Sequence, residues 1–98
     1  MPDDTIEIEN INTPGRTSRV GREKFEAMKT ALLHSLTSEP PGMSAAEMKA
    51  ALLPHLPQAL FPNGEKAGWW MKSVQLDQEA KGIIKRSNTK PLRFYRVS

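Results

Sequence analysis

EAKGIIKRSNTKPLRFYRV, residues 79–97, is the stretch that decides the fold. A helix is expected to end inside it, because Gly82 stands where a left-handed residue commonly closes a helix. Ile83–Arg86 then predicts a strand, Ser87–Lys90 a turn, and Leu92–Val97 a second strand. We therefore expect a β-hairpin directly after a helix, near the C-terminal end of the sequence.

Three helices are predicted before this hairpin. The first spans about residues 22–36, with its apolar positions on one face: Phe25, Met28, Leu32 and Leu36. The second begins at Ser44, because Ser44 and Glu47 have the spacing of a capping box, and Pro54 stops it. The third spans about residues 65–81, after a proline-rich connector.

The third helix carries two adjacent tryptophans and a polar face. At about 100° per residue, Trp69 and Trp70 fall on two apolar stripes, and we expect both indoles to be mainly buried. The alternative is that Trp70 enters a partner's pocket or stacks on a base. Lys72 and Gln75 lie on the opposite, free face, where they can hydrogen-bond base edges or phosphates. Glu79 shares that face and is expected to pair with a hairpin residue; a solvated face is the alternative.

Residues 1–19 are predicted to be an N-terminal arm, and residues 20–98 the domain. Ile6–Glu9 alternates apolar and acidic residues, as in a short edge strand. The alternatives are a disordered tail, or an acidic segment (residues 3–9) that lies against the basic hairpin as an added strand.

The net charge of +3 is unevenly distributed. Residues 65–98 hold eight Lys and Arg against three acidic residues, for +5, and residues 15–24 form a second patch of +3. Such asymmetry favours a polyanionic partner, and a solvated basic surface is the alternative. The cations of the hairpin are the candidate phosphate contacts: Lys85, Arg86, Lys90, Arg93 and Arg96. The patch upstream extends that surface if the arm folds back.

The sequence lacks the residue combinations that metal sites and common catalytic sites need. The chain has no cysteine, and its two histidines lie on different predicted elements, so we expect no metal site. No serine has an evident histidine partner, and no pair of carboxylates is set in an evident pocket. No run of about eighteen apolar residues and no secretory signal is evident. We expect a cytoplasmic protein without enzyme activity, cofactor or membrane partner.

Glu79–Arg86 resembles the E-x-K-G-L-I-x-R corner where the recognition helix meets the wing in winged helix-turn-helix domains of bacterial regulators. The resemblance covers about residues 22–97, and the chain also resembles a small uncharacterised bacterial domain family of this type. It implies an α+β fold: a winged helix, in which a three-helix bundle carries a C-terminal β-hairpin wing. Two departures are the connector of about ten residues, where such units have a turn of about 3–4, and Gln75 and Gln78, where many members have leucine.

The expected function is therefore a nucleic-acid-binding module, with double-stranded DNA as the leading ligand, in a small transcriptional regulator or accessory factor. Lys72 and Gln75 would lie nearest the bases, with the hairpin cations on phosphates. The alternative is a non-catalytic protein–protein interaction module, in which the hairpin or the arm pairs with a partner's strand. The sequence leaves the oligomeric state open.

Overall fold

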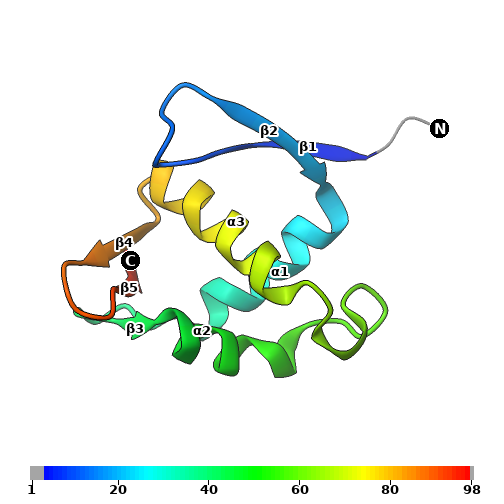
Figure 1. Ribbon diagram of the computed structural model, residues 1–98. Helices are drawn as coiled ribbons and strands as arrows, with labels where there is room; N and C mark the ends of the chain where they lie inside the picture. The colour runs from blue at the N-terminus through cyan, green and yellow to red at the C-terminus, as the bar shows by residue number, and fades with distance from the viewer. Residues whose placement is uncertain (1–3, 98) are drawn as a thin grey trace.

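Three helices and two antiparallel sheets make up the computed structural model, which describes residues 4–97 (Figure 1). The chain order is β1 (Thr5–Glu9), β2 (Thr17–Gly21), α1 (Arg22–Ser35), β3 (Met43–Ser44), α2 (Ala45–Leu52), α3 (Ala67–Ala80), β4 (Ile84–Ser87) and β5 (Arg93–Arg96). Two short 3-10 turns, Leu53–His55 and Pro62–Gly64, lie in the connector between α2 and α3. The protein is a small α+β domain.

The start of α2 and the end of α3 follow local signals that the sequence predicted. The Ser44 hydroxyl accepts a hydrogen bond from the Glu47 N–H at 3.2 Å, and the Glu47 carboxylate accepts one from the Ser44 N–H at 2.9 Å. This reciprocal pair satisfies N–H groups that have no partner within α2, and it confirms the capping box. After α3, Gly82 has φ +79°, the left-handed conformation expected there.

The C-terminal strands belong to a three-stranded sheet. β4 pairs antiparallel with β5, with Arg86 opposite Phe94, and β3 pairs with the other side of β5, with Met43 also opposite Phe94. The expected C-terminal β-hairpin was therefore an incomplete prediction, because a third strand joins it. β3 is only two residues long, too short to show an alternating pattern, and it forms because β5 offers it a partner.

The core lies between the helices and the two sheets, and its largest fully buried side chains include Phe25, Met28, Leu32, Met48, Leu52 and Phe61. Trp70 joins it at 9% exposure, edge-to-face against Phe61 with ring centroids 6.3 Å apart. Trp69 is 57% exposed. The expectation that both indoles are mainly buried is wrong for Trp69, because adjacent residues of a helix point about 100° apart and only one faces the core here.

The N-terminal segment forms a hairpin that packs on α1 and α3, on the side away from α2 (Figure 1). β1 pairs antiparallel with β2, with Ile8 opposite Ser18 and Glu9 opposite Thr17. Ile8 is buried, and Ile6 and Val20 are partly buried against the core. The acidic strand thus pairs with β2, so the alternative in which it adds to the C-terminal hairpin is wrong. β2 runs through residue 19, where we divided arm from domain.

Candidate nucleic-acid interface

A groove of about 510 Å³ separates α2, the outer side of α3 and the three-stranded sheet. Its walls include Ala45 and Ala46 of α2, Met71, Lys72, Gln75 and Leu76 of α3, and Arg86, Pro91, Leu92 and Phe94 of the C-terminal segment. The tight turn at Gly82 directs the chain back beside α3, which is why the sheet forms one wall. The groove brings together three predicted site residues: Lys72, Gln75 and Arg86.

Gln75 and Arg86 are both held by Glu79 within this groove. The Gln75 amide donates to one Glu79 oxygen at 3.3 Å, and Gln75 is only 6% exposed. The Arg86 guanidinium donates to both Glu79 oxygens, at 2.7 and 2.8 Å. The expected pairing of Glu79 with a hairpin residue is confirmed. The placement of Gln75 on a free face is wrong, because the sheet and the segment after β1 cover this half of α3.

The positive charge of Arg86 is already paired with the carboxylate of Glu79. Its hydrogen bonds to Glu79 raise the pKa of the guanidinium above its ordinary value, and the charge of Glu79 adds to this effect. The guanidinium also lies 5.6 Å from the centroid of the Phe94 ring. These contacts leave less of its charge for an external phosphate.

Arg93 and Arg96 also turn toward the protein. Arg93 donates to the Glu47 carboxylate at 3.0 Å and to the carbonyl oxygen of Gly42 at 3.1 Å. Arg96 shares the inner face of β5 with Phe94, and its Nε is buried without a hydrogen-bond partner among the described residues. Both side chains therefore contribute to the structure around the sheet.

Lys72, Lys85 and Lys90 are the three lysines of the predicted set, and all three are exposed. No described carboxylate lies within ion-pairing distance of any of the three. Lys72 lines the groove, and Lys90 precedes Pro91, which also lines it, whereas Lys85 alternates with Arg86 and points to the other side of β4. The seven predicted residues thus do not form one patch.

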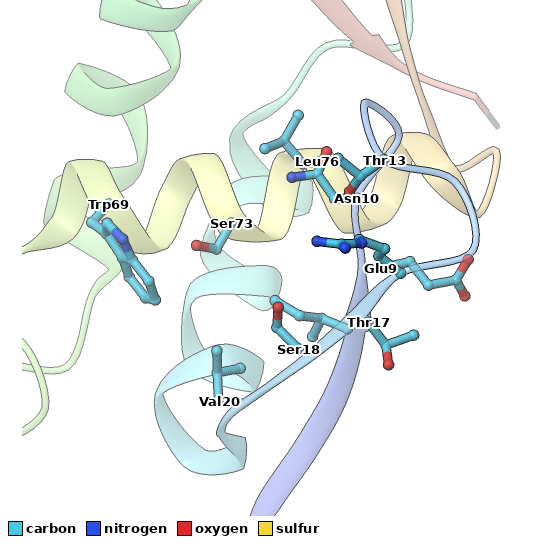
Figure 2. A pocket seen from close by; sticks show the side chains of 11 residues that line it. Glu9, Asn10, Thr13, Thr17, Ser18, Val20, Trp69, Ser73 and Leu76 are labelled. Atoms are coloured by element: carbon cyan, nitrogen blue, oxygen red, sulfur yellow. The ribbon is translucent and has the colours of Figure 1, made fainter.

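Trp69 is a surface residue that the sequence reasoning missed. A pocket of about 300 Å³ is lined by Trp69, Ser73 and Leu76 of α3 and by Ser18 and Val20 of β2. Figure 2 shows Trp69 and Ser73 on the same side of α3 as these β2 residues. Trp69 also lines an open pocket of about 490 Å³ on its other side. The available signal was the Trp-Trp pair itself, since adjacent helical residues rarely both face one core.

His34 and His55 come together, with ring centroids 4.8 Å apart, although they lie on different elements. Within residues 4–97, no cluster of three His, Cys, Asp or Glu is placed to hold a metal ion. In the same range, no helix has the length and apolar character needed to cross a membrane.

Comparison with known proteins gives a family without an assigned activity. Residues 5–94 match DUF6958, described as a family of unknown function. Neither the curated proteins nor the solved structures contain a match to this chain. Since the match runs from the start of β1 into β5 and includes all three helices, the chain belongs to the DUF6958 family.

Proposed function

We propose that residues 22–97 form a winged helix-turn-helix unit that binds double-stranded DNA. The order α1, β3, α2, α3, β4, β5 supports this, because pairing of β3 with β5 sets the β4–β5 hairpin beside α3. The resemblance of Glu79–Arg86 to winged helix-turn-helix domains lies in the turn that joins α3 to the β4–β5 hairpin. In this proposal, α3 faces the DNA and the hairpin contacts its backbone.

The observation that carries the proposal is that Lys72 lines the groove and that Lys90 directly precedes Pro91, which lines the same groove. Both are exposed and free of described carboxylate partners. A protein binds DNA largely by neutralising phosphates with such cations. Lys85 adds a third available charge on β4, while Arg86 and Arg93 are assigned to Glu79 and Glu47.

The base contacts are assigned to the N-terminal half of α3. In helix-turn-helix proteins, residues near the start of the recognition helix reach the base edges. Gln75 is buried, and the segment after β1 covers the later turns, where the Ile11 N–H donates to the Leu76 carbonyl at 3.3 Å. Lys72 is the polar side chain of the outer face that stays available.

Binding of the full chain to a random duplex, followed by fluorescence anisotropy at several salt concentrations, tests the proposal. We expect micromolar or tighter affinity at low salt and a steep fall as salt rises. Each of Lys72→Ala, Lys85→Ala and Lys90→Ala should reduce the log–log salt slope by about 1. Lys29→Ala, on α1 and outside the groove, is the control and should keep the slope.

Two results would overturn duplex binding: no detectable complex at low salt, or lysine variants whose slopes equal that of the wild type. The second candidate function, protein interaction, is favoured by the position of β4 at the edge of the sheet. A partner's strand could add there through main-chain hydrogen bonds. That function predicts no salt-dependent affinity for DNA.

A further inference from the structure

We infer that Trp69 is a stacking site for an unpaired nucleobase, and that Lys24 and Lys66 bind the phosphates beside that base. The inference rests on the proposed function for the class of ligand, nucleic acid. It goes further by naming a separate contact surface and a preferred substrate, a duplex with a single-stranded extension.

The exposed indole of Trp69 packs against the buried ring of Trp70. It meets Trp70 edge-to-face, with ring centroids 5.0 Å apart and an interplanar angle of 83°. Trp70 is in turn buried against Phe61. A T-shaped contact engages at most one face of the Trp69 ring, and 57% of the residue stays exposed to a ligand. Stacking of a base on such a ring contributes about 1–3 kcal/mol.

Two cations flank this indole. Lys24 of α1 and Lys66, which precedes α3, line the open pocket together with Trp69 and Trp70. Neither lysine lies within ion-pairing distance of a described carboxylate. The Lys24 ammonium lies 5.9 Å from the centroid of the Phe61 ring, which keeps it close to the aromatic cluster.

An aromatic face with adjacent cations matches the chemistry of a nucleotide. The ring accepts any base, and the lysines neutralise phosphates, which is the combination found where proteins bind single strands. Arg16 and Ser18 of the N-terminal hairpin line the pocket on the other side of Trp69. Each of the two pockets that Trp69 lines therefore also has a cationic side chain in its lining.

The stacking site adjoins the proposed duplex surface. Lys72 follows Trp69 by three residues, so both lie on the outer side of α3. A duplex held at Lys72 and the hairpin would leave its end near Trp69. We therefore expect the protein to favour a duplex that continues into unpaired nucleotides.

Three DNAs test this inference: a blunt duplex, the same duplex with a short thymidine extension, and the same duplex with an abasic extension of equal charge. We expect the thymidine extension to tighten binding by about fivefold to a hundredfold over the blunt duplex, the range that stacking of one base spans. The abasic extension should give little of this gain. Bound thymidine should also quench tryptophan fluorescence.

Matched variants separate stacking from folding and charge. Trp69→Leu keeps an apolar side chain but no ring, and should lose the gain while binding the blunt duplex normally. Trp69→Phe should retain part of the gain, Lys66→Ala should weaken it, and Lys29→Ala should leave it unchanged. Thermal unfolding of Trp69→Leu establishes that the variant is folded.

The outcomes are distinguishable. An equal gain from the abasic extension, or a full gain in Trp69→Leu, overturns stacking. Salt-dependent binding of the blunt duplex without any gain overturns this inference and leaves the proposed function standing. Quenching by a thymidine oligonucleotide without duplex binding overturns the proposed function and supports the stacking site. Equal quenching by a poly-glutamate peptide would assign the site to acidic proteins and overturn the inference.

Discussion

The guanidinium of Arg86 on β4 binds the carboxylate of Glu79 on α3 through two hydrogen bonds, of 2.7 and 2.8 Å. The Glu79 side chain is only 4% exposed, whereas that of Arg86 is 36% exposed. The pair joins the last turn of the helix to the sheet and spans the turn at Gly82. It makes Arg86 a structural residue of the corner from which a nucleic-acid role was expected.

Arg86→Ala should destabilise the domain because it leaves the nearly buried Glu79 carboxylate without its cation. We expect a loss of about 2 kcal/mol, below the ~3–5 kcal/mol for a fully buried pair, since Arg86 is partly solvated. Lys85→Ala, the neighbouring exposed position, should change stability by less than about 0.5 kcal/mol. Urea denaturation followed by tryptophan fluorescence measures both. Equal midpoints would show that the pair contributes nothing.

Asp77→Ala should detach the N-terminal hairpin from α3. The Asp77 carboxylate is fully buried and accepts the Glu9 N–H at 2.8 Å and the Lys81 ammonium at 2.8 Å. A hydrogen bond to a charged group contributes about 1.5–3 kcal/mol, so protection of the Glu9 amide should fall tenfold or more. Hydrogen exchange reports this directly. Asp4→Ala, which removes an exposed pair with Arg22, should leave that amide protected.

Gly42→Ala should prevent the pairing of β3 with β5. Gly42 has φ +96°, and a Cβ there would overlap the carbonyl oxygen of Phe94. Gly82→Ala shares the positive φ but meets no atom within 4 Å, so it should cost only about 1–2 kcal/mol of backbone strain. Gly21→Ala has neither problem and should be nearly neutral. Thermal unfolding should rank them in that order, and a stable Gly42→Ala protein would refute the close packing.

The carboxylate of Glu47 should make folding stability depend on pH. The hydrogen bond from the Ser44 backbone N–H lowers the pKa of Glu47 below its ordinary value of 4.5, and the positive charge of Arg93 lowers it further. Because the pKa is lower in the folded state, the stabilisation is present above about pH 4.5 and is lost as the pH falls through the folded pKa.

Unfolding midpoints of wild type and Glu47→Gln, compared between neutral and acidic pH, measure this contribution. Their difference should be largest above pH 4.5 and should shrink on acidification. Ser44→Ala should cost about 1 kcal/mol at neutral pH, because it removes the hydroxyl that caps α2 while the backbone donor to Glu47 remains. A Glu47→Gln difference that does not vary with pH would contradict the assignment.

The elements that could be predicted are those with local causes. The capping box at Ser44, the closing glycine at Gly82 and the apolar face of α1 each depend on residues a few positions apart. The two C-terminal strands were also predictable, because their alternation and the turn between them lie in one stretch. The pairing of Glu79 followed from its position facing a basic hairpin.

The errors concern which face of α3 is covered. Gln75 was placed on a free face and is buried, whereas Trp69 was placed in the core and is exposed. Both depend on the segments that pack on α3 from elsewhere in the chain. The bond between Glu9 and Asp77 joins residues 68 positions apart, and no local pattern specifies such a contact.

The sequence by itself determined the order of the three helices and the two C-terminal strands, because backbone conformation responds to caps, glycines, prolines and apolar spacing within a few residues. Tertiary structure alone decided the pairing of β3 with β5, the docking of the N-terminal hairpin, and which cations stay free. The physical reason is that exposure and charge neutralisation are properties of the packed surface. Lys85 and Lys90 therefore remain available to an external anion, whereas Arg86 and Arg93, which look similar in the sequence, are paired with Glu79 and Glu47.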